Sequence, residues 1–303
     1  MKQSNGINIT GATGFVGSNL FEYLLDHNWE PISLNLRNTN WKSKIDNESI
    51  AIIHLAGKAH DLKKSSDPED YFDINSKLTQ EIFDVFLASN SRDFIFFSSV
   101  KAVTDKAGGI ITEETVTNPQ TAYGQSKLQA EQYILSKALP LGKRVFIIRP
   151  AMIHGPDNKG NLNLLYKLVS GGIPWPLGAF ENKRSFCSID NVCFVINEIL
   201  ENNNIPSGIY NLTDDRPIST NRLIELISIS LDKKTIIYKI PRKIINILVK
   251  AGDFFSLPLN TERLDKLTEN FVVSNEKIVK VIGKSLPVSV EDGLIKTFNS
   301  FKL

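Results

Sequence analysis

Tyr123 and Lys127 are four residues apart in the run Tyr123-Gly-Gln-Ser-Lys127, a spacing that places both side chains on one face of a helix. A free phenol, with a pKa of about 10, is a poor acid–base catalyst at neutral pH. A neighbouring ammonium group favours the phenolate and is expected to lower that pKa. The pair is therefore a candidate proton-transfer device for a hydroxyl or a ketone, although a packed tyrosine beside a solvated lysine has the same spacing.

Two serines are expected close to this pair. Ser98 and Ser99 follow residues 92–97, a largely apolar run that is typical of a strand in a buried parallel sheet. Ligands of open α/β sheets bind at the carboxyl ends of the strands, where Ser99 is predicted to lie. The helix of Tyr123 begins after Pro119, so a hydroxyl, a phenol and an amine are expected at one edge of the sheet.

A glycine-rich turn near the amino terminus predicts a dinucleotide site. The β-branched run at residues 7–10 is expected to be a strand, and residues 18–25 have a helical pattern. Glycines between a strand and a helix let the backbone approach a pyrophosphate, which the amino terminus of the helix favours. The spacing is Gly-x-x-Gly-x-x-Gly rather than the commoner Gly-x-Gly-x-x-Gly. The cofactor contacts predicted here are Gly11, Thr13, Gly14, Phe15, Val16 and Gly17.

The ends of the next two strands bear on the choice between NAD and NADP. After the predicted strand at residues 31–35, the place of the acidic residue that holds the ribose of NAD carries Asn35, with Arg37 close behind. An arginine pairs with a 2′-phosphate, which favours NADP or tolerance of both cofactors, unless Arg37 is only a surface charge. The third strand, residues 50–55, leads to small residues that let a cofactor lie close to the backbone. Leu55 and Ala56 are the cofactor contacts predicted there.

Taken together, the glycine turn, Ser98-Ser99 and Tyr-x-x-x-Lys resemble the extended short-chain dehydrogenase/reductases, specifically the nucleotide-sugar epimerase/dehydratase family. The resemblance extends through Arg149-Pro150 and His154-Gly-Pro, with His154 in the usual tyrosine place, to the final Glu291-Asp-Gly293. It implies an α/β fold with a Rossmann-type doubly wound parallel sheet. Residues 1–150 would be the NAD(P)-binding domain, and residues 151–303 a smaller substrate-binding lobe of which part returns to the sheet.

The resemblance also implies roles for individual residues. Tyr123 would be the catalytic acid and base, and Lys127 its partner, which also holds the nicotinamide ribose. Ser99 would bind the sugar oxygen that becomes the ketone. Asn161 and Arg184 would face the diphosphate of the nucleotide-sugar substrate. A homodimer and the cofactor NAD or NADP are expected.

Departures from the family pattern narrow the expected reaction. Dehydratases of the family usually carry Thr-Asp-Glu at the serine position, whereas this chain has Val100-Lys101 after its serines. Ser-Ser-Val-Lys resembles a subgroup of O-antigen and capsule sugar pathways. That resemblance implies a 4-epimerase or 4-keto reductase of a nucleotide-linked hexose, with UDP as the expected nucleotide. A sugar dehydratase and a non-catalytic nucleotide sensor on the same fold are the alternatives.

Composition excludes several classes of function. A formal net charge of +2, without a dominant basic run, argues against a nucleic-acid partner. The two cysteines have no metal-binding or secretory spacing, so no metal site is expected. Without a signal peptide or a bilayer-spanning apolar stretch, the protein is expected to be cytoplasmic. Residues 241–255 predict a helix, apolar on one side and basic at intervals, which fits either a membrane surface or packing against protein.

Overall fold

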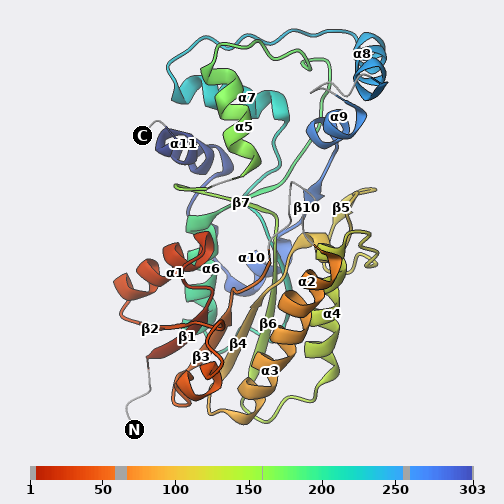
Figure 1. Ribbon diagram of the computed structural model, residues 1–303. Coiled ribbons are helices and arrows are strands. Elements are labelled where there is room, and N and C mark those ends of the chain that lie inside the picture. Colours follow the sequence, from red (N-terminus) through yellow and green to blue (C-terminus); the bar gives the residue numbers. More distant parts are fainter. Residues whose placement is uncertain (1–4, 59–66, 159, 255–259, 302–303) are drawn as a thin grey trace.

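The computed structural model describes residues 5–58, 67–158, 160–254 and 260–301, and within these the side chain of Asn161 is excluded. A parallel sheet of six strands forms the lower half of the molecule in Figure 1. Its spatial order is β2-β1-β3-β4-β6-β9. The strands are β1 (Gly6–Thr10), β2 (Glu30–Leu34), β3 (Ala51–His54), β4 (Asp93–Phe97), β6 (Arg144–Pro150) and β9 (Gly208–Leu212).

Alternating side chains of the strands enter two different cores. In β4, Ile95 and Phe97 face the core shared with α1 and α6, whereas Phe94 and Phe96 face the core shared with α3 and α4. Helices therefore cover both faces, which confirms the predicted doubly wound α/β fold. These helices are α1 (Phe15–Asp26), α2 (Pro68–Phe72), α3 (Leu78–Ala88), α4 (Ala122–Ser136), α6 (Ile189–Glu201) and α10 (Glu276–Ile282), with a π-helical turn at Asp73–Lys77.

A third core lies above the sheet and gathers helices from the second half of the chain (Figure 1). They are α5 (Asn161–Ser170), α7 (Thr220–Ser230), α8 (Arg242–Phe254), α9 (Thr261–Thr268) and α11 (Val290–Ser300). Two short parallel pairs lie between this part and the sheet: β7 (Met152–His154) with β8 (Phe186–Ser188), and β5 (Ile110–Ile111) with β10 (Val272–Val273). β9 lies in the second half of the chain but belongs to the sheet. The boundary at residue 150 between a cofactor-binding domain and a substrate-binding lobe therefore stays a prediction.

The order of the strands reverses at β1, whose neighbours are β2 on one side and β3 on the other. In open α/β sheets such a reversal opens a crevice at the carboxyl ends of the strands. Thr10 ends β1 there, beside His54 at the end of β3. The loops that follow these strands are therefore the ones placed to hold a ligand.

Candidate active site

The glycine-rich turn joins β1 to α1, and the helix begins inside it, three residues earlier than its pattern predicted. Gly11 has a φ of +70°, and a Cβ there would lie 2.7 Å from the backbone nitrogen of Ala56 and 3.0 Å from the carbonyl carbon of Leu55. A Cβ on Gly17 would lie 2.1 Å from the oxygen of Gly11. Only glycine fits these positions. Gly14, the N-cap, has no side chain to satisfy the first N–H groups of α1, which leaves them for an anion.

Buried hydrogen bonds fix the loop after β3 against this turn. The Oγ1 atom of Thr10 accepts a hydrogen bond from the backbone nitrogen of Ala56 at 3.1 Å and contacts His54 Nδ1 at 2.7 Å. The other ring nitrogen of His54 lies 2.9 Å from Thr79 Oγ1. Burial, with the charge of Lys127 as a smaller cause, lowers the pKa of His54 to about 3. His54 is thus a neutral structural residue.

The end of β2 carries an amide and an exposed cation. Asn35 and Arg37 are both exposed, and Asn35 Oδ1 accepts a hydrogen bond from the backbone nitrogen of Arg37 at 3.0 Å. Leu34 pairs with Thr10, so these residues lie at the same edge as the glycine turn. A cofactor at this edge meets no carboxylate at the end of β2.

Ser99, Tyr123 and Lys127 converge where β4 ends beside α4, as the sequence predicted. Ser99 forms a hydrogen bond with the phenol of Tyr123, which lowers the pKa of Tyr123, but burial raises that pKa more strongly. Lys127 is 5% exposed, and its Nζ atom donates to the backbone oxygen of Phe97 at 2.8 Å. Burial lowers the pKa of Lys127 to about 8. The expectation of a Tyr123 pKa lowered overall is therefore wrong for this structure, because desolvation dominates.

A buried asparagine connects this cluster to the loop after β3. Asn75 Oδ1 accepts from the backbone nitrogen of Lys58 at 2.8 Å, and its Nδ2 donates to Lys58 O and to Ser126 Oγ at 3.1 Å each. A Cβ on Gly57 would lie 3.1 Å from Lys127 Nζ, so small size is needed there as well. Asn75 lies in the π-helical turn, a distortion that is frequent at functional sites. Its polar side chain in an otherwise apolar helical pattern is the signal that marks this position in the sequence.

Glu131, one helical turn beyond Lys127, binds two neighbours of the cluster. Its carboxylate accepts from Ser98 Oγ, from Arg149 Nε at 2.9 Å and from Arg149 Nη2 at 2.5 Å, and all three side chains are buried. Its charge also raises the pKa of Lys127, against the effect of burial. The sequence analysis missed Glu131, although its i+4 spacing from Lys127 was a visible signal.

Asp105 holds the amino terminus of α4. Its Oδ2 atom accepts from the backbone nitrogens of Gln120 and Thr121 at 2.7 and 3.0 Å, and its Oδ1 atom accepts from Thr121 Oγ1 at 3.0 Å. Thr121 in turn caps the helix by accepting from Gly124 N at 3.2 Å. Tyr123 is therefore placed by a cap that extends back to the segment after Ser99.

Of the predicted diphosphate contacts, one side chain is described. The guanidinium of Arg184 donates to the backbone oxygen of Lys266 and lies 3.6 Å from Glu269. The charges of Glu269 and Arg184 both act on the pKa of Lys101, which burial lowers, so Arg184 lies near the segment that follows the serines. The side chain of Asn161 lies outside the described residues. His154, in the family's tyrosine place, is buried and bonds Asp214 at 3.0 Å, so it is structural here.

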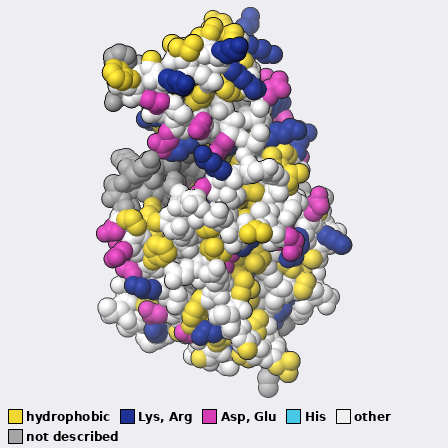
Figure 2. Space-filling view, turned by 90° about the vertical axis from the view of Figure 1, so that its right-hand side faces the viewer, with side chains coloured by type: hydrophobic (Ala, Val, Ile, Leu, Met, Phe, Trp, Pro, Cys, Tyr) yellow, Lys and Arg dark blue, Asp and Glu magenta, His cyan; other side chains and the backbone are white. Residues whose placement is uncertain are grey.

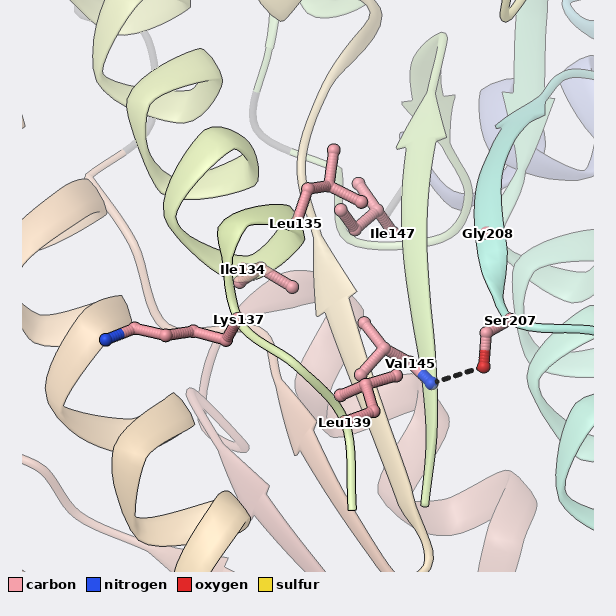
Figure 3. Close-up of a pocket in the computed structure, with 8 residues that line it drawn as sticks. All are labelled: Ile134, Leu135, Lys137, Leu139, Val145, Ile147, Ser207 and Gly208. Atoms are coloured by element: carbon pink, nitrogen blue, oxygen red, sulfur yellow. Dashed lines mark hydrogen bonds between the residues drawn. The ribbon is translucent and has the colours of Figure 1, made fainter. Parts of the chain in front are cut away.

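An apolar pocket lies elsewhere, at the amino-terminal edge of the sheet beneath the end of α4 (Figure 3). Its one hydrogen bond among the residues drawn joins the backbone nitrogen of Val145 to Ser207 Oγ at 2.9 Å. The pocket is far from Ser99 and Tyr123 along the strands and offers little to a polar substrate. Over the residues that can be described, no group of three or more His, Cys, Asp or Glu side chains is arranged to hold a metal.

Residues 7–213 match the NAD dependent epimerase/dehydratase family. The UDP-glucose 4-epimerase of Vibrio cholerae is 27% identical over 99% of this chain and 96% of its own length. The GDP-6-deoxy-D-mannose reductase of Pseudomonas aeruginosa is 25% identical over 73% of this chain and 78% of its own. The crystal structure of UDP-N-acetylglucosamine 4-epimerase from Bacillus cereus superposes with a TM-score of 0.78, at 18% identity, over 98% of this chain and 99% of that one.

Proposed function

The chain belongs to the NAD dependent epimerase/dehydratase family, and we propose that it is a nucleotide-sugar 4-epimerase that acts on a UDP-linked hexose. One observation carries the proposal: Ser99, Tyr123 and Lys127 converge at the same sheet edge as the glycine turn. Similarity to a UDP-glucose 4-epimerase along nearly the whole chain supports the choice of substrate class.

The residues present fit a dinucleotide. Gly11 and Gly17 leave space that a Cβ would fill, and the amino terminus of α1 offers N–H groups to a pyrophosphate. Leu55 and Ala56 border that space, and Arg37 is exposed near the end of β2. Bound NAD or NADP supplies a hydride acceptor and donor at the sugar carbon.

The chain's own residues would manage the proton. Ser99 orients the oxygen on C4 of the sugar, the phenolate form of Tyr123 accepts its proton on oxidation, and the resulting phenol returns it on reduction. Lys127, whose Nζ atom donates to the oxygen of Phe97, stabilises the phenolate form of Tyr123. Burial raises the pKa of Tyr123, so the phenolate that begins oxidation depends on a nearby positive charge for its stabilisation.

A second candidate is a 4-keto reductase, which the end of β2 favours. The amide of Asn35 does not repel a 2′-phosphate, and the exposed Arg37 is able to pair with one. This arrangement suits NADPH as a dissociable reductant. In either reaction the run Ser98-Ser-Val-Lys101 supports a role in surface-polysaccharide sugar synthesis. We also propose that the protein is a homodimer and acts in the cytoplasm.

The dinucleotide that copurifies with the protein separates the two candidates. Purified, untreated protein is denatured and the released nucleotides are identified by mass. Stoichiometric NAD would indicate a retained, recycled cofactor and support the epimerase. Protein without a dinucleotide that binds NADPH more tightly than NADH would support the reductase. Failure to retain or bind either cofactor would overturn the reading of the glycine turn.

A further inference from the structure

Helix α8 has two apolar stripes, and packing explains only one of them. Ile245, Val249 and Gly252 are buried and face the third core. Ile244, Ile247 and Leu248, at i, i+3 and i+4, form a second stripe on another face, and they are 49%, 68% and 52% exposed. A helix that only packs on a lobe needs one apolar stripe and a polar opposite face. The second stripe therefore calls for another apolar partner.

The charge of this segment is unusual for the chain. Residues 233–252 contain no Asp or Glu, although the whole chain has a formal net charge of only +2, so the remainder is net acidic. The cations of the segment are Lys233, Lys234, Lys239, Arg242, Lys243 and Lys250. In the part of the chain that is described, none of the six lies within ion-pair distance of a carboxylate. Lys233 and Arg242 donate to the backbone oxygens of Ser170 and Ala179. The exposed Lys239, Lys243 and Lys250 would meet an anionic partner without a competing carboxylate.

Further exposed apolar side chains precede α8 at the same end of the molecule. Ile236 and Tyr238 are 47% and 55% exposed, and backbone hydrogen bonds to Trp175, of 2.8 Å each, hold their segment in place. Figure 2 shows hydrophobic and basic side chains together at this upper end, where Figure 1 places α8. We call this the α8 surface: Ile236, Tyr238, Lys239, Lys243, Ile244, Ile247, Leu248 and Lys250.

We propose that the α8 surface binds the surface of an anionic lipid bilayer. An apolar stripe flanked by lysines is the composition of helices that lie in the membrane interface, where lysines meet anionic headgroups. None of the described helices is both long enough and apolar enough to cross a bilayer, so contact would be peripheral.

A second copy of the chain is the weaker occupant. In a two-fold contact the same patch meets itself, so Lys243 and Lys250 would face like charges. A stable interface buries about 800 Å² on each partner, which is more than a few side chains of one helix provide. The inference does not depend on the proposed reaction, because none of these residues lies in the candidate active site.

Vesicle sedimentation with the full-length protein tests the proposal. We expect the protein to pellet with vesicles of phosphatidylcholine and phosphatidylglycerol at 70:30, to pellet little with phosphatidylcholine alone, and to be released by high salt. The double variant Ile247→Glu with Leu248→Glu should lose at least tenfold in binding. Lys243→Gln with Lys250→Gln should weaken binding severalfold, and only to the anionic vesicles.

Matched controls keep the result interpretable. Leu141 is fully exposed and distant in sequence, so Leu141→Glu should bind vesicles like the wild type, and Lys106→Gln serves the same purpose for charge. Equal melting temperatures and equal turnover of a soluble nucleotide sugar would show that the variants fold. The proposal is overturned if the α8 variants still pellet, if Leu141→Glu fails equally, or if the α8 variants convert a dimer into a monomer by light scattering.

Discussion

At the scale of single residues, two opposed influences set the chemistry of Tyr123. Burial raises the pKa of its phenol, and the hydrogen bond with Ser99 acts in the other direction. Lys127, whose pKa burial lowers to about 8, donates a hydrogen bond from its Nζ atom to the oxygen of Phe97. In the proposed reaction the phenol form donates the proton on reduction, and the phenolate that accepts it on oxidation relies on the ammonium charge of Lys127.

Removing the phenol oxygen tests this role. Tyr123→Phe should lower kcat by about 10²- to 10⁴-fold, the usual range for a lost general acid–base group. Melting temperature and dinucleotide binding should stay near those of the wild type, because the ring still packs edge-to-face on Tyr71. Tyr238→Phe, at an exposed tyrosine, is the control and should keep full activity. Equal kcat in the Tyr123 variant would contradict the acid–base role of Tyr123.

The Lys127 ammonium is predicted to set the alkaline limb of the pH profile. Because its pKa is about 8, protonated Lys127 and hence kcat should decline as pH rises through that region. Glu131 raises this pKa, so Glu131→Gln should move the limb to lower pH. Ser98→Ala removes one hydrogen bond of Glu131 but keeps its charge, and should leave the limb in place. A limb that does not move in the Glu131 variant would contradict the assignment.

At the scale of elements, the turns and caps at the sheet edge position these groups. The glycine turn before α1 lies close to the loop after β3, at Gly11 and Ala56. At the start of α4, Thr121 is hydrogen-bonded to Asp105, which lies in the segment that follows the serines. Much of this was predictable: the strand–glycine–helix pattern, the serines at a strand end and the Tyr-x-x-x-Lys spacing are local signals.

The remainder was not predictable, because it depends on burial and on contacts between distant segments. The raised pKa of Tyr123 follows from desolvation, which spacing does not reveal. The π-helical turn that turns Asn75 toward Lys58 interrupts a sequence that reads as one continuous helix. The partners of Arg184 are more than 80 residues away in the chain, so its contacts with Lys266 and Glu269 had no local signal.

Gly17→Ala should destabilise the glycine turn. The new Cβ would lie 2.1 Å from the oxygen of Gly11, so backbone must move, at a cost of about 3 kcal/mol in the free energy of unfolding. Dinucleotide affinity should fall more than tenfold. Gly109→Ala, where a Cβ meets nothing within 4 Å, is the control for both urea unfolding and cofactor titration. Unchanged affinity in the Gly17 variant would separate this turn from the cofactor.

Asp105→Ala should lower kcat about tenfold by loosening the start of α4. The chain offers a matched control in Asp253, which holds the backbone and hydroxyl of Thr261 at α9 as Asp105 holds Thr121. Each substitution removes hydrogen bonds to a threonine at the start of a helix and should lower stability. Asp253→Ala should match that loss in urea unfolding without changing kcat. Equal kcat values for the two variants would contradict the proposal that Asp105 positions the start of α4 for catalysis.

At the scale of the whole molecule, buried polar links join the upper helices to the sheet. His154 in β7 contacts Thr297 in α11 at 3.0 Å and Asp214 beyond β9 at 3.0 Å. Asp214 also accepts from the backbone of Ser188 and from Asn191, at 2.7 Å each. These links connect the segments that follow β6 and β9 with the last helix. They give the upper half a fixed position over the sheet edge where the proposed chemistry takes place.

The proposed 4-epimerase activity is tested directly by following the interconversion of sugar epimers. Purified protein is incubated separately with UDP-glucose and UDP-galactose, and with their N-acetylated counterparts, while proton NMR follows the anomeric and H4 signals. We expect that one pair converges on the same mixture from both directions without added reductant, and that Tyr123→Phe abolishes this. If protein with verified bound NAD leaves every one of these sugars unchanged, the proposed epimerase is wrong.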